Sequence, residues 1–244
     1  ILSTEGLEGV NEIKITPLKP IRPMLAERIT DPREALKRSN SMIALEYKLD
    51  GERVQIHKDK SEVQLFSRSL EKITFHYPDI IDSIKNFKIN RCILEAEIVS
   101  INLTTKEIQP FQELMHRKRK YDIHDIVKKY PIKVYLFDLL YIEGKDLTNY
   151  EYIKRRKILE TVVKENKNNT IDVVQQIVSS NLNKIENFFT QAKLDGCEGL
   201  MLKQLNSRYR AGAREYLWMK LKKEYDNALG DSFDLTVIGA LLGR

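Results

Sequence analysis

The sequence predicts an α+β fold in which largely antiparallel sheets are flanked by helices. Strand-like segments occur in adjacent groups instead of alternating strictly with helices, and such grouping is typical of antiparallel pairing. The strand-like segments lie at 43–48, 52–58, 62–67, 92–101, 133–142, 198–203 and 216–222. Helical periodicity occurs near 33–38, 78–86, 121–129, 151–165 and 182–194. No internal repeat is visible, and 244 residues suffice for one full hydrophobic core.

The composition excludes several classes of protein. With 42% hydrophobic and 31% charged residues, the chain is typical of a globular domain. It has no apolar run as long as a membrane span and no signal-peptide pattern, so no membrane partner is expected. Cys92 and Cys197 lack metal-ligand spacing and are expected to be reduced thiols in an intracellular protein. The net charge of +6 favours a polyanionic partner.

The first segment, residues 1–20, is predicted to be a linker or the tail of a preceding module. It is polar and leads into LKPIRP, whose prolines disfavour regular structure. The chain begins at Ile1 rather than at methionine, so we expect it to be a piece of a longer protein.

The most informative segment is EYKLDGER, residues 46–53. Residues 43–47 are apolar and β-prone, and they predict a strand that runs into the DG turn. Because side chains alternate across a strand, Glu46 and Lys48 share one face. A lysine on that face, beside a glycine that lets backbone or ligand approach closely, is placed to act as a nucleophile. From this motif alone, a solvated strand lysine is an equal alternative.

Two later strands carry carboxylates in otherwise apolar segments. In ILEAEIVSI, alternation puts Glu95 and Glu97 on one face, and Glu198 opens EGLMLK close to two glycines. Such carboxylates suit Mg²⁺ binding or hydroxyl recognition, and an open polar sheet face is the alternative. Lys203 ends EGLMLK, but alternation puts it opposite Glu198, so we exclude it from the candidate site.

Two basic runs are candidates for binding an anion. In LWMKLKKEY, alternation puts Trp218, Lys220 and Lys222 on one strand face. Two lysines on one face repel each other unless an anion lies between them, so a phosphate contact is expected there. The run HRKRK at 116–120 is either a phosphate contact or a solvated loop.

Three more residues are candidates. Arg53 and Arg68 follow strand segments and could each bind a phosphate through two hydrogen bonds, although lone arginines usually lie on solvated surface. Phe137, within the apolar VYLFDLLYI, is either a core residue or an aromatic ring that stacks on a nucleobase. His57 is interpreted as structural. Together the residues describe a lysine that attacks a nucleotide phosphorus, since nearby cations favour the neutral amine that attack requires.

Six segments resemble, in the same order, the adenylation domain of ATP-dependent DNA ligases of the archaeal and eukaryotic type. They are EYKLDGER, FSRSLEKITFHYPDI, ILEAEIVS, LFDLLY, EGLMLK and LWMKLKKEY. The resemblance implies a nucleotidyltransferase (adenylation) domain of DNA ligase type at 21–230, with a nucleotide cleft between its sheets. It also implies that 1–20 is the tail of a DNA-binding domain, and that 231–244 begins a truncated OB-fold domain.

The resemblance also implies roles for individual residues. Lys48 would carry AMP as a covalent phosphoramidate, Glu46 would recognise the adenine amino group, and Phe137 would stack on the base. The nucleotide-binding residues would be Glu46, Arg53, Arg68, Glu97, Phe137, Arg214, Lys220 and Lys222, and the metal ligands would be Glu97 and Glu198. The implied cofactors are ATP and Mg²⁺, with Mn²⁺ as an alternative.

The implied reaction joins nicked double-stranded DNA. AMP would pass from the lysine to the 5′-phosphate of the nick, and the 3′-hydroxyl would then expel AMP. An archaeal protein of this type would be cytoplasmic and a eukaryotic one nuclear, and whether a sliding clamp recruits the parent protein is left open. Without the OB-fold domain, the fragment is expected to be only partly active.

Two alternatives to a DNA ligase are compatible with the sequence. An RNA ligase or an mRNA-capping guanylyltransferase of the same superfamily shares KxDG, the carboxylate strands and the paired lysines. A non-catalytic nucleic-acid-binding module would use the basic faces to hold phosphates. It would bind DNA without regard to ATP or to a change at Lys48.

Overall fold

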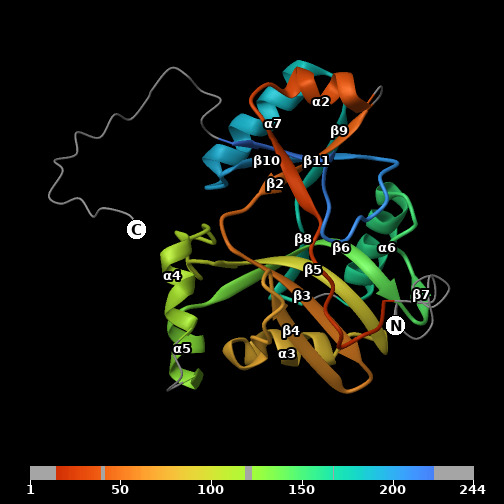
Figure 1. The fold of residues 1–244 in the computed structure, drawn as a ribbon. Helices are drawn as coiled ribbons and strands as arrows, with labels where there is room; N and C mark the ends of the chain where they lie inside the picture. Colours follow the sequence, from red (N-terminus) through yellow and green to blue (C-terminus); the bar gives the residue numbers. More distant parts are fainter. Residues whose placement is uncertain (1–14, 40–41, 119–122, 167, 223–244) are drawn as a thin grey trace, which may run out of the picture.

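The computed structural model contains two β-sheets with helices around them (Figure 1). It describes residues 15–39, 42–118, 123–166 and 168–222. The predicted OB-fold start at 231–244, and most of the predicted linker at 1–20, lie outside the described residues.

The first sheet, called sheet A, has five strands in the order β1-β11-β10-β2-β9. Its pairs are antiparallel except for β1 with β11, which are parallel. Helices α2 (Pro32–Ser39) and α7 (Leu182–Leu194) pack against it. The strands are β1 (Leu25–Ile29), β2 (Ile43–Lys48), β9 (Gln176–Ser179), β10 (Gly199–Gln204) and β11 (Arg214–Lys222).

The second sheet, called sheet B, has the order β4-β3-β5-β6-β7, and β8 pairs in parallel with β6. The other pairs are antiparallel, so the prediction of an α+β fold with largely antiparallel sheets is confirmed. The strands are β3 (Glu52–Asp59), β4 (Glu62–Ser67), β5 (Arg91–Ser100), β6 (Ile132–Ile142), β7 (Lys145–Asp146) and β8 (Ile171–Val173).

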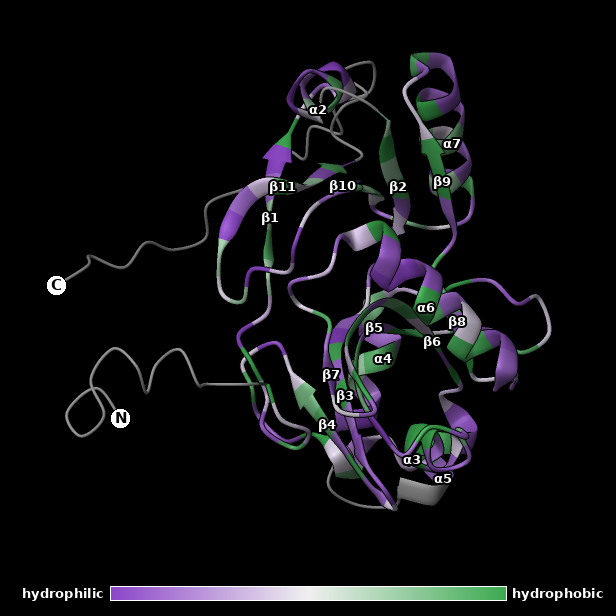
Figure 2. Ribbon diagram, turned by 90° about the vertical axis from the view of Figure 1, so that its right-hand side faces the viewer, coloured by the Kyte–Doolittle hydropathy of each residue, from purple (hydrophilic) through white to green (hydrophobic). Residues whose placement is uncertain are grey.

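Four further helices accompany sheet B. They are α3 (Pro78–Lys85), α4 (Phe111–Met115), α5 (Ile123–Lys129) and α6 (Tyr152–Glu165), with 3₁₀ turns η1 (Thr74–His76) and η2 (His116–Lys118). The helices carry both hydrophobic and hydrophilic residues (Figure 2), as expected when one side faces a core. Among the described residues, no helix combines the length and apolar character that crossing a bilayer requires.

Hydrophobic clusters hold each sheet to its helices and the two sheets to each other. One cluster joins sheet B to α3 and α6, and a second joins sheet A to α2 and α7. A third contains Ile93 of β5, Leu140 of β6 and Trp218 of β11. Because these three residues come from both sheets, burial of their apolar surface stabilises the junction at which the sheets meet.

A segment that precedes β1 is bound to the middle of β3. The amide of Ile21 donates to the side chain of Gln55 at 3.1 Å, and Gln55 donates back to the carbonyl of Ile21 at 2.7 Å. The amide of Leu18 donates to Nδ1 of His57 at 3.0 Å. His57 is fully buried, and its ring must be neutral at Nδ1 to accept this hydrogen bond.

Acid is therefore expected to weaken the fold through His57. Burial lowers the pKa of His57 from 6.5 to about 3. Since the folded-state pKa is below the unfolded value, the stabilisation is complete above pH ~6.5 and is lost as the pH falls toward the folded-state pKa. The difference between the two pKa values corresponds to about 5 kcal/mol of unfolding free energy. The melting temperature of the wild-type protein should fall more steeply than that of His57→Gln between about pH 6.5 and pH 4; parallel curves would contradict this expectation.

Candidate active site

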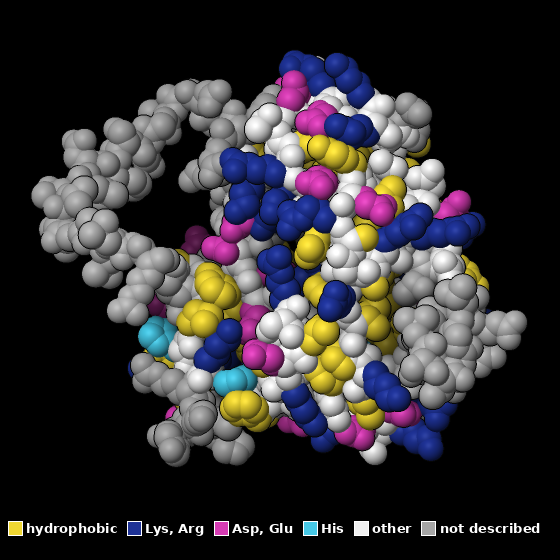
Figure 3. Space-filling view, viewed as in Figure 1, with side chains coloured by type: hydrophobic (Ala, Val, Ile, Leu, Met, Phe, Trp, Pro, Cys, Tyr) yellow, Lys and Arg dark blue, Asp and Glu magenta, His cyan; other side chains and the backbone are white. Residues whose placement is uncertain are grey.

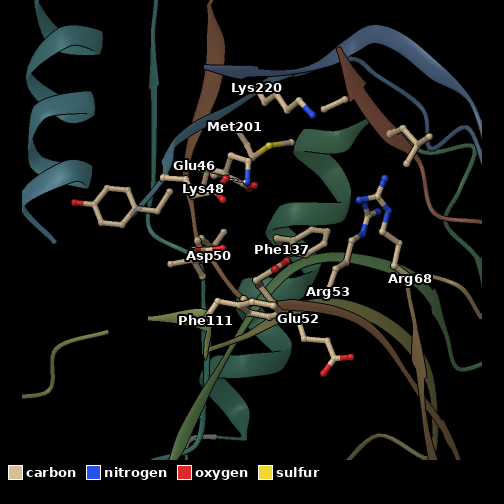
Figure 4. Close-up of a pocket in the computed structure, with 18 of the residues that line it drawn as sticks. Glu46, Lys48, Asp50, Glu52, Arg53, Arg68, Phe111, Phe137, Met201 and Lys220 are labelled. Carbon is tan, nitrogen blue, oxygen red and sulfur yellow. Dashed lines mark hydrogen bonds and ion pairs between the residues drawn. The ribbon is translucent and has the colours of Figure 1, made fainter. Parts of the chain in front are cut away.

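A cleft between the two sheets contains all the predicted site residues. Its volume is about 900 Å³. The lining includes Glu46, Lys48, Arg53, Arg68, Glu97, Phe137, Glu198, Arg214, Lys220 and Lys222. The residues on one side belong to β2 and β11 or, for Glu198, directly precede β10. Those on the other side belong to strands of sheet B or, for Arg68, directly follow β4, and the close-up in Figure 4 shows several of them. Lysine and arginine side chains also gather across the middle of the face seen in Figure 3.

Lys48 is the last residue of β2 and lies opposite Gly199 of β10. Its amine forms an ion pair with Glu198, whose Oε2 is also 3.3 Å from Nζ of Lys222. Although burial opposes the ionised form, the hydrogen bonds and charges of the two lysines hold the pKa of Glu198 below its ordinary value. Burial and the nearby Glu198 raise the pKa of Asp50. One carboxylate is therefore shared by two lysines at the centre of the cleft.

Two glycines allow the backbone to approach closely behind this centre. A Cβ added at Gly51 would lie 2.2 Å from the carbonyl oxygen of Ile98, and one at Gly199 would lie 2.1 Å from that of Leu221. Gly199 also has φ of 147°, a conformation that other residues rarely adopt. Both glycines thus permit close packing against the backbone of a neighbouring strand. Of the two possibilities that the sequence left open for the glycine beside Lys48, approach of backbone or of a ligand, the structure shows the approach of backbone.

Of the two carboxylates on β5, only Glu97 lines the cleft. Glu95 is fully buried and accepts from Nη2 of Arg53 with both oxygens, at 2.9 and 3.0 Å. Arg53 also donates to the carbonyl of Met24 at 2.8 Å, while its Nε is buried without a hydrogen-bond partner among the described residues. Burial raises the pKa of Glu97 to about 7, against the charges of Arg53 and Lys48. Glu95 is therefore a support for Arg53, and Glu97 faces the space.

Positive charge is concentrated at one end of the cleft. Burial lowers the pKa of Lys220, and the charges of Lys222, Lys48, Arg214 and Arg68 lower it further. Met219 and Leu221, on the opposite face of β11, are in the core. The alternation predicted for LWMKLKKEY is thus present, and it directs both lysines into the cleft.

The structure describes the run HRKRK only up to Lys118. The sequence left two interpretations of this run, a phosphate contact or a solvated loop, and neither fits Arg117. That side chain is fully buried and donates to both oxygens of Asp79 at 2.9 Å. Lys118 lines the cleft and pairs with Glu52 at 3.0 Å. The remaining residues, 119–120, lie outside the described residues. Arg117 is buried because its guanidinium also bonds two carbonyls of the α5 segment, which no local pattern reveals.

Comparison with known proteins decides the family. Residues 23–222 match the family model described as "ATP dependent DNA ligase domain". The chain belongs to this family. It is 50% identical to the DNA ligase of Nitrosopumilus maritimus (strain SCM1) and 45% identical to that of Acidianus ambivalens. Both alignments cover 100% of this chain and 41% of the relative, so the chain spans about two fifths of the length of these relatives.

Solved structures of ATP-dependent ligases have the same fold. A mycobacterial DNA ligase D complexed with ATP and MES has a TM-score of 0.66 and 26% identity, covering 85% of this chain and 62% of that one. The Chlorella virus DNA ligase-adenylate, at 15% identity and a TM-score of 0.54, is similar in fold alone. The resemblance drawn from the six sequence segments is thereby confirmed.

Several cleft residues of this ligase domain were not among the sequence candidates, Lys203 and Met201 among them. Lys203, which strand alternation excluded, lines the cleft, and so does Met201. Glu198 itself precedes β10, which begins at Gly199 with its positive φ, so the alternation within the strand cannot be counted from Glu198. Pairing was the missing signal: Met201 lies opposite Glu46 in the register of β10 with β2, so Met201 and Lys203 share its face.

The acidic residues of the ligase cleft are compatible with a divalent cation that takes only some of its ligands from the protein. In the described part of the chain, no three His, Cys, Asp or Glu side chains are arranged to hold a metal ion. Glu97 and Glu198 both line the cleft. Mg²⁺ usually takes one or two carboxylates and completes its shell with water and phosphate oxygens, so two glutamates fit it.

Proposed function

We propose that the parent protein is an ATP-dependent DNA ligase and that this chain carries its lysine adenylation site. The observation that carries the proposal is the position of Lys48. It ends β2 inside the cleft, ion-paired with Glu198 and accompanied by Lys220 and Lys222. We place the adenylation domain at 21–230, as the sequence segments imply.

In the first step, the neutral amine of Lys48 attacks the α-phosphorus of ATP. A nitrogen–phosphorus bond forms, the bond from phosphorus to the bridging oxygen breaks, and pyrophosphate leaves as the amine loses a proton. The amine is paired with Glu198 in the free protein, so attack requires this carboxylate to move, and Lys222 at 3.3 Å is a second partner for it. Lys220 and Lys222 would offset the charge on the α-phosphate.

The remaining residues would hold the nucleotide. Glu46 takes the adenine amino group, Phe137 stacks on the base, and Arg53 with Glu97 binds the ribose. Arg68 and Arg214, both exposed at the cleft, contact phosphates of ATP or of DNA. Glu97 and Glu198 would hold a divalent cation, Mg²⁺ or Mn²⁺, whose charge offsets that of the phosphates.

In the later steps, AMP passes to the 5′-phosphate of nicked duplex DNA and the 3′-hydroxyl displaces it. The basic residues at the cleft support a partner held through its phosphates, so DNA binding should weaken with salt. The buried free thiols of Cys92 and Cys197 fit a reducing, intracellular setting. Recruitment by a sliding clamp would act through parts of the parent protein.

Intact mass tests the proposal directly. This chain, and a version extended past Arg244, are incubated with magnesium and with ATP, GTP or NAD⁺ separately. We expect an added AMP from ATP, located at Lys48 by peptide mapping. A guanylate adduct would indicate a capping guanylyltransferase instead. Absence of any adduct on the extended version would contradict the proposal and favour a non-catalytic nucleic-acid-binding module.

A further inference from the structure

Helix α6 contacts both walls of the cleft through two consecutive arginines. Arg155 is fully buried and donates from Nε and Nη2 to the two oxygens of Asp138, at 2.8 and 2.9 Å. Arg156, 5% exposed, donates from Nη1 to Glu46 at 3.1 Å. Asp138 belongs to β6 of sheet B, and Glu46 to β2 of sheet A. One turn of helix therefore holds one carboxylate from each sheet.

Each of these carboxylates adjoins a residue placed in the cleft. Asp138 directly follows Phe137, and Glu46 lies two residues before Lys48 on the same face of β2. The positions of the aromatic ring and of the Glu46 carboxylate are thus tied to the same helix.

The Glu46 carboxylate is held by four partners. Its Oε1 accepts from the hydroxyl of Tyr152, from Arg156, and from the amide of Gln176 at 3.0 Å. Its Oε2 is 2.6 Å from Nζ of Lys203. The side chain is 1% exposed, and with so many fixed donors it has a single orientation.

Lys203 closes the network between the two sheets. Besides pairing with Glu46, its Nζ donates to the carbonyl of Phe137 at 3.3 Å and lies 4.8 Å from the centre of that ring. Arg155 also donates to the carbonyls of Tyr150 and Ser207, at 2.6 and 3.1 Å, which fixes its own position. The network therefore runs without a break from β2 through α6 to β6.

Such a network is a weak source of stability, because the cost of removing charges from water offsets most of their attraction. Its defined geometry is better explained by the site it supports. We propose that Tyr152, Arg155 and Arg156 are positioning residues that fix Glu46 and Phe137 relative to each other and so determine which nucleotide base the cleft accepts. This inference rests on the proposed function, in which Glu46 and Phe137 receive the base.

The physical reason is the geometry of hydrogen bonding to the base. Adenine presents an amino group where guanine presents a carbonyl, and a carboxylate accepts from the first but repels the second. A carboxylate that is free to rotate could turn away from the carbonyl and relax this discrimination. Selectivity therefore depends on the donors that keep Glu46 in place.

The test compares adenylation kinetics of Tyr152→Phe and Arg156→Gln with those of the wild-type protein, using ATP and GTP. We expect the KM for ATP to rise about tenfold with kcat little changed, since loss of one buried donor costs that much binding. The preference for ATP over GTP in kcat/KM should fall by a similar factor. If these residues served stability alone, the variants would have a lower melting temperature, while the KM for ATP and the preference for ATP over GTP would be unchanged.

A matched control removes an equivalent group elsewhere. Lys58→Met removes a buried cation, which bonds the carbonyls of Ile84, Lys85 and Phe87 on the far side of sheet B. This variant should lower the melting temperature and leave the KM for ATP and the base preference unchanged.

Three outcomes would overturn the inference. Tyr152→Phe with wild-type KM and base preference is decisive, because this variant loses a single oxygen atom and should fold even if Arg156→Gln does not. An equal shift in the Lys58→Met control would show that the kinetics follow stability alone. Absence of an adduct on the wild-type protein extended past Arg244 would overturn the proposed function together with this inference. In the first two outcomes the wild-type adduct still forms, so the two kinds of failure can be told apart.

Discussion

Replacing Lys48 by arginine is expected to abolish the AMP adduct while the fold persists. A guanidinium stays charged at every accessible pH, so it has no free electron pair with which to attack phosphorus. Arginine retains the positive charge that pairs with Glu198, and the Lys48 side chain is partly exposed, so the larger group has room. Loss of a nucleophile typically lowers the rate by several orders of magnitude.

The measurement is intact mass after incubation with ATP and magnesium, together with the melting temperature. Lys157→Arg, on the exposed side of α6, is a matched control that should form the adduct as the wild-type protein does. The extended Lys48→Arg protein should still seal nicked DNA that already carries 5′-AMP, since that step does not use the amine. An AMP adduct on Lys48→Arg would show that another residue is the nucleophile.

Strand alternation predicted much of the site because the site lies on sheets. In LWMKLKKEY, the period of two put Lys220 and Lys222 on the face that lines the cleft, and the structure places Met219 on the other. The same rule succeeded for Glu95 and Glu97, which share a face but have different surroundings. Alternation gives the side of the sheet, and only the packing above it distinguishes a residue that contacts a ligand from one that supports its neighbour.

The residues that hold Glu46 could not be predicted in this way. Tyr152 is 106 positions from Glu46 in the sequence, and Gln176 is 130 positions away. Their segments read as an ordinary amphipathic helix and a short β-branched stretch. The contacts arise because α6 packs across the junction of the sheets, which is a property of the tertiary structure.

The elements that the sequence did not predict are mostly short and lie at edges. Strands β1 and β9 are the two edges of sheet A, and their burial is incomplete. Edge strands show little apolar periodicity, because one side of each is open and carries polar residues such as Glu27. Helix α4 has five residues, too few for a period of 3.6 to be recognised.

Replacing Arg53 by glutamine is expected to have the largest effect on stability among the changes considered for the cleft. The change leaves the fully buried Glu95 without its cation, although Tyr209 still donates to Glu95 at 2.9 Å. Removing one partner of a buried ion pair costs about 3–5 kcal/mol, because the remaining charge is neither solvated nor paired. It also removes the hydrogen bond to Met24, which ties the segment before β1 to the cleft. Urea unfolding measures the loss.

The double variant Arg53→Gln/Glu95→Gln tests whether the unpaired charge of Glu95 causes this loss of stability. If the loss comes from a buried carboxylate without a cation, changing Glu95 to glutamine in the Arg53→Gln background should restore a large part of the stability. The two neutral amides can then form a hydrogen bond with each other. AMP adduct formation should stay low in both variants, since both lack the guanidinium of Arg53, which lines the cleft and which we propose binds the ribose. Additive losses in the double variant would mean that Arg53 stabilises the fold through its packing against Phe137 and Trp218 rather than through its charge.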